Sequence, residues 1–413
     1  MLLSKEFKLH ITEEQASIIS HLGYAAYKLW NLCNYERIHA DELEEYPDWY
    51  YQKKAHKDDV WFKSLPSQTA QEVCKLLDKS WKSYFALCKK HKEMNPRYPR
   101  FKQEPIPFTY MQNGIVHKGK QLRLSLSKRF KEHMAERYDI HADYLYLQND
   151  GFEDMEHIKQ IKLYPTESTE LKAIVVYEVA DVPIKEDNGR YLSIDLGVHN
   201  LFTCFDSQAG SFIVGRRYLS IVRFFDKEIA YYQSIADAQQ SAQGIKYPKK
   251  TKRVLALYEK KRASIKDYLH KCTRYIVDYC VKNNIHRVII GDITGIRKDA
   301  NFGNVGNQKL HGLPYRQIVQ MLAYKLAKEG ILLMQQNEAY TSQCPPDSVN
   351  IDKYHAEKSN RKERGLYAKN GMIWNADSVG AFNILRKYLK RASINISCDL
   401  NLIKETRVIK VAV

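Results

Sequence analysis

The pattern of hydrophobic and polar positions divides the chain into two halves of different character. In the first half, residues 5–12 (KEFKLHIT) alternate between polar and apolar and predict a strand, after which Thr12 can cap a helix. Residues 13–46 and 65–92 are predicted to be helical. Residues 105–185 contain short alternating pieces separated by turn residues, and this pattern predicts a mostly β region.

The helix predicted at 65–92 has the clearest amphipathic pattern, because its apolar residues recur at three- and four-residue steps. This stripe consists of Ala70, Val73, Cys74, Leu77, Trp81, Tyr84, Phe85 and Cys88. Gln68, Gln71 and Lys75 lie on other faces of the helix. The prolines of NPRYPRFK, residues 95–102, are expected to end it.

A turn, DNGR at 187–190, marks the start of the second half. The expected elements are strands 191–197, 201–206 and 211–215, a helical region 217–284, strand 286–293, a Gly/Asn-rich loop 301–307, helix 315–329, strand 331–336, an irregular stretch to 374 and helix 377–390. Three strands followed by helix, strand, helix, strand and helix is the order of an RNase H-like sheet. The predicted fold class is therefore mixed α/β.

Length and composition limit the class of protein. A chain of 413 residues exceeds the roughly 250–300 residues that one hydrophobic core supports, so at least two domains are expected. No apolar run reaches the roughly 18 residues of a membrane span, and MLLSKEFKLHIT lacks a signal-peptide core. The eight cysteines form no CxxC pair and indicate reduced core residues, with Cys272 and Cys280 on one buried helix face. We expect a cytoplasmic, nucleoid-associated protein of a bacterium or archaeon, without a membrane partner.

The charge balance indicates a polyanionic partner. Lys and Arg number 65 against 48 Asp and Glu, a net charge of +17, and nucleic acid is the favoured class. Cations cluster in residues 82–102, where aromatic residues are interleaved with them, and in residues 246–274. The candidate contacts are Lys82, Arg97, Arg100, Lys102, Lys260 and Arg262. A solvated face with core aromatic residues is the alternative for the first segment.

Two aspartates lie where a carboxylate is expensive to bury. Asp195 falls inside the apolar strand pattern I-D-L-G, so it needs a partner or a metal ion unless it merely makes a turn at the strand end. Asp377 precedes an apolar helix stripe and would either face the sheet or cap that helix.

Four segments in order carry a resemblance to a known family: YLSIDLGVHNLFT (191–203), HRVIIGDITGIRK (286–298), NEAYTSQC (337–344) and NADSVGAFNILRKY (375–388). Together with KLLDKSWKSYF and NPRYPRFK in the first half, they resemble the TnpB family of transposon-encoded RNA-guided DNA endonucleases. This family is related to compact type V CRISPR effectors and to the eukaryotic Fanzors. The resemblance runs from about residue 5 to 390.

The resemblance implies an architecture and a reaction. A β-barrel wedge domain would comprise residues 1–12 and 103–186, with a helical recognition insertion at 13–102 and a RuvC nuclease domain of RNase H type at 187–413. Three acids would hold two Mg²⁺ ions and hydrolyse phosphodiester bonds of guide-matched DNA. Guide RNA and target DNA are the implied partners, and no obligate protein partner is expected. Gln68, Gln71 and Lys75 occupy the region that the family uses to read a short motif beside the target.

The third acid departs from the family pattern, because Gly291 stands where a glutamate is usual. Asp292 follows directly, but one step along a strand points to the opposite face. Glu338 follows strand 331–336 at a position that is often proline, and Gly291 would leave room for its carboxylate. The resemblance to Fanzors and to some TnpB proteins, in which the glutamate is relocated in this way, implies the same role for Glu338. The expected catalytic and metal-binding residues are Asp195, Glu338 and Asp377; Asp292, or no working third acid, are the alternatives.

A second departure concerns zinc. The family usually carries four zinc-binding cysteines in the segment corresponding to 341–374, where only Cys344 and His355 remain. A tetrahedral structural site needs four ligands, so this target-binding insertion is expected to contain no zinc. Two other functions stay open, an RNA-guided repressor that binds DNA without cutting and a DNA transposase that transfers strands.

Overall fold

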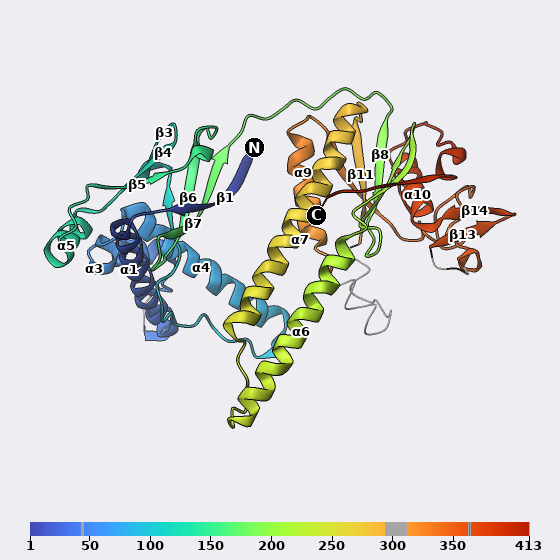
Figure 1. Ribbon diagram of the computed structural model, residues 1–413. Coiled ribbons are helices and arrows are strands. Elements are labelled where there is room, and N and C mark those ends of the chain that lie inside the picture. The colour runs from blue at the N-terminus through green and yellow to red at the C-terminus, as the bar shows by residue number, and fades with distance from the viewer. Residues whose placement is uncertain (43–44, 294–311, 362, 364, 413) are drawn as a thin grey trace. The chain divides into compact units, whose positions relative to one another are not determined.

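The computed structural model describes residues 1–413 except 43–44, 294–311, 362, 364 and 413 (Figure 1). The chain divides into two compact units, Met1–Ala180 and Asp181–Val413. Helices and strands both occur in each unit, so the predicted mixed α/β class is confirmed. The predicted Gly/Asn-rich loop 301–307 lies outside the described residues.

The first unit combines helices with two antiparallel sheets. Its elements are β1 (Leu2–His10), α1 (Glu13–Ile38), η1 (Ala40–Glu42), α2 (Trp49–Ala55), α3 (Val60–Lys63), α4 (Ser67–Lys90), η2 (Lys92–Met94), β2 (Phe108–Met111), η3 (Gln112–Gly114), β3 (Ile115–Lys118), β4 (Gln121–Ser125), α5 (Lys128–Tyr138), β5 (Tyr144–Gln148), η4 (Asp150–Phe152), β6 (Ile158–Tyr164) and β7 (Glu170–Glu178). The strand orders are β1-β7-β6-β2 and β3-β4-β5. Closure of these strands into a barrel stays a prediction.

One predicted boundary in this unit was wrong, and one helix was not predicted. The helix expected at 13–46 begins with the predicted Thr12 cap but ends at Ile38, because the polar stretch that follows offers no apolar stripe to bury. The region expected to be mostly β contains α5. Phe130 and Met134, four residues apart, bury one face of that helix, a helical spacing too short to stand out in the sequence.

The apolar stripe of α4 is shorter than its sequence pattern. Its buried members are Ala70, Val73, Cys74, Leu77 and Trp81. Phe85 is 46% exposed, so the expected stripe fails beyond Trp81. There the rings pack on one another at the surface, and Tyr98 stacks on Trp81 with ring planes 2° apart.

The second unit is built on one six-stranded mixed sheet. Its elements are β8 (Tyr191–Asp195), β9 (Phe202–Asp206), β10 (Gly210–Val214), α6 (Tyr218–Ala242), α7 (Lys252–Lys282), β11 (Arg287–Asp292), α9 (Tyr315–Ala327), β12 (Leu332–Asn337), η5 (Lys358–Asn360), β13 (Leu366–Lys369), β14 (Met372–Asn375), α10 (Ala376–Arg391), η6 (Leu400–Ile403) and β15 (Thr406–Ile409). The strand order is β12-β11-β8-β9-β10-β15. β11 runs parallel to both β8 and β12.

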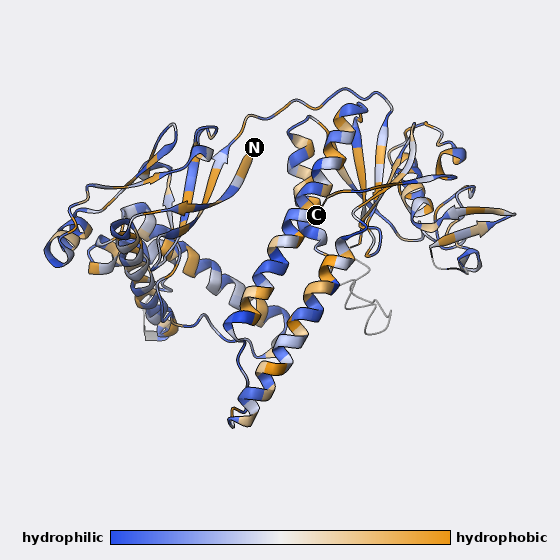
Figure 2. Cartoon of the chain, in the orientation of Figure 1, coloured by the Kyte–Doolittle hydropathy of each residue, from blue (hydrophilic) through white to orange (hydrophobic). Residues whose placement is uncertain are grey.

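Helices cover both faces of this sheet (Figure 1). Ile289 of β11 packs in the cluster that includes α10, whereas Ile290 packs in the cluster that includes α7 and α9. Figure 2 shows β11 as largely hydrophobic, as expected for a strand covered on both faces, while α6 and α7 mix hydrophobic and hydrophilic residues. Cys272 and Cys280 are both buried on α7, which confirms the predicted helix face.

Three strands of this unit were not predicted. The hairpin β13–β14 lies within the stretch expected to be irregular. β15 pairs in parallel with β10 at the edge of the sheet, and its TRVI sequence has too few apolar residues to be recognised as a strand. Among the described residues, no helix combines the length and the apolarity needed to cross a membrane.

Candidate active site

Three adjacent parallel strands end at one edge of the six-stranded sheet. Asp195 is the last residue of β8, Gly291 and Asp292 end the neighbouring β11, and Glu338 directly follows β12. The carboxyl ends of parallel strands meet at the same edge, where open α/β sheets commonly bind ligands. The strand order β12-β11-β8 therefore brings two of the expected acids to one edge.

Asp195 lies on the face of the sheet that α10 covers. Ser193, two residues earlier on the same face, donates a hydrogen bond to the carbonyl oxygen of Ala381 on α10 at 2.6 Å. A Cβ atom added at Gly380 would lie 2.4 Å from Oδ2 of Asp195. Gly380 therefore lets the helix backbone approach this carboxylate closely.

Glu338 occupies the space that a side chain at position 291 would need. A Cβ atom added at Gly291 would lie 2.4 Å from Oε2 of Glu338 and 3.0 Å from Cδ1 of Ile384 on α10. The same Oε2 atom is buried and has no hydrogen-bond partner among the described residues. The absence of a side chain at Gly291 thus coincides with a glutamate that enters from the next strand.

Asp292 belongs to the other face of the sheet. Tyr315 of α9 donates a hydrogen bond to its carboxylate, with 3.4 Å from Oη to Oδ1. α9 covers the face opposite to α10, as the packing of Ile289 and Ile290 shows. The register argument from the sequence therefore agrees with the packing.

Asp377 lies in the first turn of α10 but does not cap the helix. Asn375 is the cap, and its Oδ1 accepts hydrogen bonds from the amides of Asp377 and Ser378. Asn200 donates from Nδ2 to Oδ2 of Asp377 at 2.8 Å. The capping alternative for Asp377 is thus wrong, and its carboxylate is directed toward the loop after β8.

Asn200 is a site residue that the sequence analysis missed. It lies in the loop between β8 and β9, where the amide of Gly197 donates to the carbonyl oxygen of Asn200 at 3.1 Å. A Cβ atom at Gly197 would lie 2.8 Å from that oxygen, so the tight loop requires glycine. In the sequence, only the position of Asn200 within the motif around Asp195 could have indicated that it belongs to the site.

The electrostatics of these acids reflect their proximity. Burial raises the pKa of Asp195 well above its ordinary value, the negative charges of Glu338 and Asp377 raise it further, and Arg361 lowers it. Burial and the charge of Asp292 raise the pKa of Glu338 to about 7, whereas Lys387 lowers it. The group of acids therefore favours a proton or a cation, and Arg361 and Lys387 offset its negative charge only in part.

The acids are of the ligand type that a hard metal ion prefers, but their carboxylates are not yet arranged around one common point. Carboxylate oxygens are the ligands that Mg²⁺ prefers, and the unpartnered Oε2 of Glu338 is available to one. Within the part of the chain that the structure describes, however, no group of three or more His, Cys, Asp and Glu residues is arranged to hold a metal ion. A bound cation would have to draw the carboxylates together.

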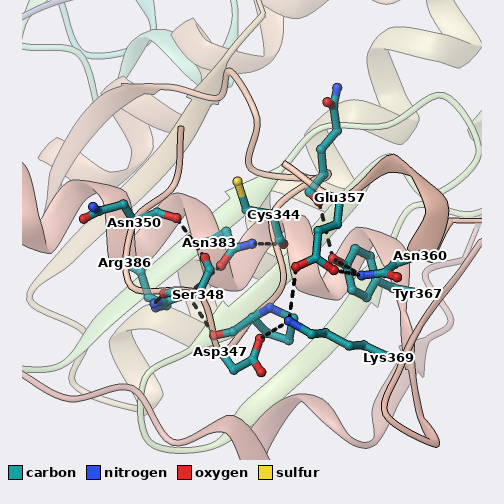
Figure 3. A network of polar contacts seen from close by, with 12 residues as sticks. Cys344, Asp347, Ser348, Asn350, Glu357, Asn360, Tyr367, Lys369, Asn383 and Arg386 are labelled. Carbon is teal, nitrogen blue, oxygen red and sulfur yellow. Dashed lines mark hydrogen bonds and ion pairs between the residues drawn. The ribbon is translucent and has the colours of Figure 1, made fainter. Parts of the chain in front are cut away.

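Polar contacts join the described part of segment 341–374 to α10 (Figure 3). Asn383 donates to the carbonyl oxygens of Thr341 and Cys344, at 2.8 and 2.9 Å. Arg386 donates to the carbonyl oxygen of Pro346 at 2.8 Å. Cys344 Sγ donates to the carbonyl oxygen of Asp352 at 3.3 Å. These bonds hold residues 341–352 in place, and the absence of zinc stays a prediction.

The polar face of α4 borders a small hollow in the first unit. Gln68, Gln71 and Lys75 line it together with residues 111–113, and its volume is about 260 Å³. The Oε1 atom of Gln68 is buried, and no residue that the structure describes forms a hydrogen bond with it. Lys75 is paired with Glu72 at 2.6 Å.

The predicted cationic surfaces are exposed. Phe85, Tyr98 and Phe101, which lie among the cations of 82–102, are 46%, 49% and 47% exposed. This exposure contradicts the alternative of core aromatic residues for these three rings. Lys82, Arg100, Lys102, Lys260 and Arg262 are exposed, and Arg97 also lies at the surface.

Parts of the chain are similar in sequence to known protein families and to individual proteins. A family model described as "Probable transposase" (OrfB_IS605) matches residues 174–297, and one described as "Cas12f1-like, TNB domain" matches residues 315–384. A TnpB-like protein of Methanocaldococcus jannaschii is 24% identical over 144 residues, which are 34% of this chain and 49% of that protein. The CRISPR-associated endodeoxyribonuclease Cas12f1 of Sulfoacidibacillus thermotolerans is 31% identical over 83 residues.

Both matches are partial in length. The chain spans about half of the archaeal relative (49%), and the match to Cas12f1 covers 20% of this chain and 18% of that protein. A cryo-EM structure of a Cas12f1–sgRNA–target DNA complex aligns with a TM-score of 0.54 over 90% of this chain and 81% of that chain, at 15% identity. At this identity the likeness concerns the fold alone.

Proposed function

The chain belongs to the TnpB family, and from this premise we propose that it is an RNA-guided DNA endonuclease that hydrolyses phosphodiester bonds of guide-matched DNA. The observation that carries the proposal is that the carboxylate of Glu338 occupies the space that a side chain at Gly291 would need. A position that lacks its acid is filled, on the same face of the sheet as Asp195, by a carboxylate from the neighbouring strand. A relative that had merely lost the acid would not need a glutamate there.

Asp195, Glu338 and Asp377 would hold two Mg²⁺ ions. When bound, such ions activate a water and stabilise the leaving oxygen of an in-line displacement. The residues around the acids prepare them for this role. Gly380 gives the Asp195 carboxylate room, and Asn200 orients the Asp377 carboxylate by its 2.8 Å hydrogen bond. Cations would offset the burial and the repulsion by Glu338 and Asp377, which together raise the pKa of Asp195.

Guide RNA and target DNA would be bound by the cationic surfaces of both units. The exposed cations and rings of 82–102, with Lys260 and Arg262 on α7, offer charge for phosphates and faces for stacking. The hollow beside Gln68, Gln71 and Lys75 would read the short motif beside the target, and the unpartnered Oε1 of Gln68 supports this. This proposal includes the domain boundaries given above for the wedge domain, the recognition insertion, the nuclease domain and the target-binding insertion. It also includes action on DNA of the cytoplasmic nucleoid.

A cleavage assay tests the proposal. The protein is purified with its copurifying RNA, the guide is read by sequencing, and matched DNA is offered with Mg²⁺. Asp195→Ala, Glu338→Ala and Asp377→Ala should each abolish cleavage while RNA binding persists, because each removes a metal ligand. Asp292→Ala is the matched control and should still cut. Normal cutting by Glu338→Ala together with loss of cutting by Asp292→Ala would reverse the assignment of the third acid.

A repressor that binds guided DNA without cutting is the second candidate. It is favoured by one observation, that the described residues contain no group already arranged to hold a metal ion. The same assay separates the two functions. Guide-dependent DNA binding without product at any Mg²⁺ or Mn²⁺ concentration would support the repressor.

A strand-transferring transposase is the third candidate, and the description of one matching family model is its motive. An RNase H-like fold permits such chemistry, but fold alone does not determine activity. Strand-transfer products from transposon ends in the absence of RNA would support it over the endonuclease.

A further inference from the structure

Two side chains of α10 hold the turn that carries Glu338, residues 337–341, here called the Glu338 turn. Nζ of Lys387 donates to the carbonyl oxygen of Ala339 at 2.8 Å. Nδ2 of Asn383 donates to the carbonyl oxygen of Thr341 at 2.8 Å, and Asn383 is fully buried. The turn is therefore bound to the helix at two backbone positions on either side of Tyr340.

The Glu338 turn needs such support because its backbone is strained. Tyr340 adopts the left-handed region with φ 68°, which a residue with a side chain rarely occupies. Within the turn, the amide and the hydroxyl of Thr341 both donate to the carbonyl oxygen of Glu338, at 3.1 and 2.8 Å. These bonds fix the main chain of Glu338, and Lys387 and Asn383 fix the turn on the helix.

The arrangement on the helix links this support to the site. Asn383 and Lys387 are four residues apart and therefore share one face of α10. Asp377 and Gly380 occupy the first turns of the same helix. We propose that Lys387 and Asn383 are positioning residues for Glu338, so that the helix which carries Asp377 also sets where the relocated acid lies. This inference rests on the proposed function, in which Glu338 is a metal ligand.

The first test measures the turn itself, without metal or nucleic acid. Amide hydrogen exchange of residues 337–344 is measured in the wild-type protein and in three variants, Lys387→Met, Lys387→Arg and Lys390→Met. Loss of the bond to Ala339 should speed exchange of this segment by roughly tenfold in Lys387→Met, because local opening becomes easier. Lys387→Arg should restore slow exchange. Lys390→Met removes the same charge one turn further along, where the side chain contacts Asn350 instead, and should exchange like the wild type.

The second test measures metal binding, with Mn²⁺ as the probe in titration calorimetry. Lys387→Met should bind Mn²⁺ roughly tenfold more weakly than the wild type, as is typical when a residue that orients a ligand is lost. Lys390→Met should bind normally, and Asp195→Asn should bind least.

The outcomes separate the inference from the proposed function. Unchanged exchange in Lys387→Met would overturn the positioning role, and so would faster exchange with unchanged Mn²⁺ affinity, which would leave Lys387 a structural residue only. If the wild type and Asp195→Asn bound Mn²⁺ equally poorly, the metal site of the proposed function would fail, while exchange in Lys387→Met would still decide whether the turn is held by the helix.

Discussion

Gly291 and Gly380 shape the candidate site because each lacks a side chain beside a carboxylate. Neither has a left-handed backbone, so conformational freedom does not explain these glycines. In both cases a Cβ atom would lie 2.4 Å from a carboxylate oxygen, of Glu338 in one case and of Asp195 in the other. The atoms in the way are the ends of side chains, which can move without unfolding the sheet. An added methyl group should therefore disturb the acids more than the fold.

Gly291→Ala and Gly380→Ala should test this separation. We expect cleavage to fall roughly 100-fold in each variant, because a shift of about 1 Å in a catalytic group has such an effect. The free energy of unfolding should change by less than about 1 kcal/mol, since glycine inside a helix (Gly380) or a strand (Gly291) is less stable than alanine by roughly 0.5–1 kcal/mol and the displaced carboxylates can rotate away. Single-turnover cleavage and thermal melting are the measurements.

Gly312→Ala is the matched control for these variants, because no atom of the described residues lies within 4 Å of its added Cβ. It should melt and cut like the wild type. Full cleavage by Gly291→Ala would show that the position of Glu338 beside Gly291 has no bearing on the reaction.

At the scale of elements, α10 contributes one acid of the candidate site and contacts the strand that carries another. It begins at the Asn375 cap, carries Asp377 in its first turn, and approaches β8 at Gly380. Ser193 of β8 donates to the backbone of the helix at Ala381 with a 2.6 Å hydrogen bond. The start of this helix should therefore matter for both stability and activity.

Asn375→Ala should lower the free energy of unfolding by about 1 kcal/mol, because two amides of the first turn lose their acceptor. Asn375→Ser, which keeps a capping oxygen, should retain most of that stability. Chemical denaturation of the two variants and the wild type measures the difference. Equal stability of the alanine and serine variants would mean that the cap contributes nothing.

A second element-scale contact joins β8 and β9 to α7. Asp206, at the end of β9, is fully buried, and Arg190 donates to both of its carboxylate oxygens at 3.2 and 2.8 Å. Tyr279 of α7 adds a 2.8 Å hydrogen bond. Because the carboxylate would remain buried without its cation, Arg190→Met should destabilise the protein by about 3–5 kcal/mol.

Arg274→Met is the matched control for Arg190→Met. It removes an arginine from an exposed ion pair with Asp278 on the surface of α7, and such pairs contribute at most about 1 kcal/mol. Denaturation midpoints of the two variants should therefore differ clearly. Similar midpoints would argue that the Arg190–Asp206 pair has little structural importance.

At the scale of the whole molecule, the dominant feature is a net charge of +17 combined with exposed aromatic rings. Phe85, Tyr98 and Phe101 project among cations in the first unit, and Lys260 and Arg262 are exposed on α7 in the second. This combination is typical of surfaces that bind single-stranded or guide nucleic acid. Affinity for the guide should then be governed mainly by phosphate contacts.

RNA affinity should fall by roughly 1,000-fold between about 50 and 200 mM salt, because binding releases counterions from the phosphates. Replacing Lys260 and Arg262 by alanine should reduce the slope of log affinity against log salt by roughly 1 to 2. Lys271→Ala, whose charge is paired with Asp267 at 2.9 Å, should change the slope less. Filter binding across a salt series measures all three, and a flat response would contradict a phosphate-led interface.

Local pattern determined much of this molecule in advance. The amphipathic stripe of α4, the buried strands around Asp195 and Gly291, and the helix after Asp377 followed from periodicity, which depends only on neighbouring residues. The charge and the ordered motifs indicated nucleic acid and the family, and the family relationship is confirmed. The one-residue step from Gly291 to Asp292 already indicated which of them faces away.

Only the tertiary structure decided which residues meet. The Oε2 atom of Glu338 beside Gly291, Asn200 on the carboxylate of Asp377, and Lys387 on the Glu338 turn join residues from 47 to 177 positions apart. The edge strand β15 and the end of the α4 stripe also depended on neighbours from elsewhere in the chain. Periodicity shows which face of an element is apolar, but the partner that covers the face is set by the packing of the whole unit.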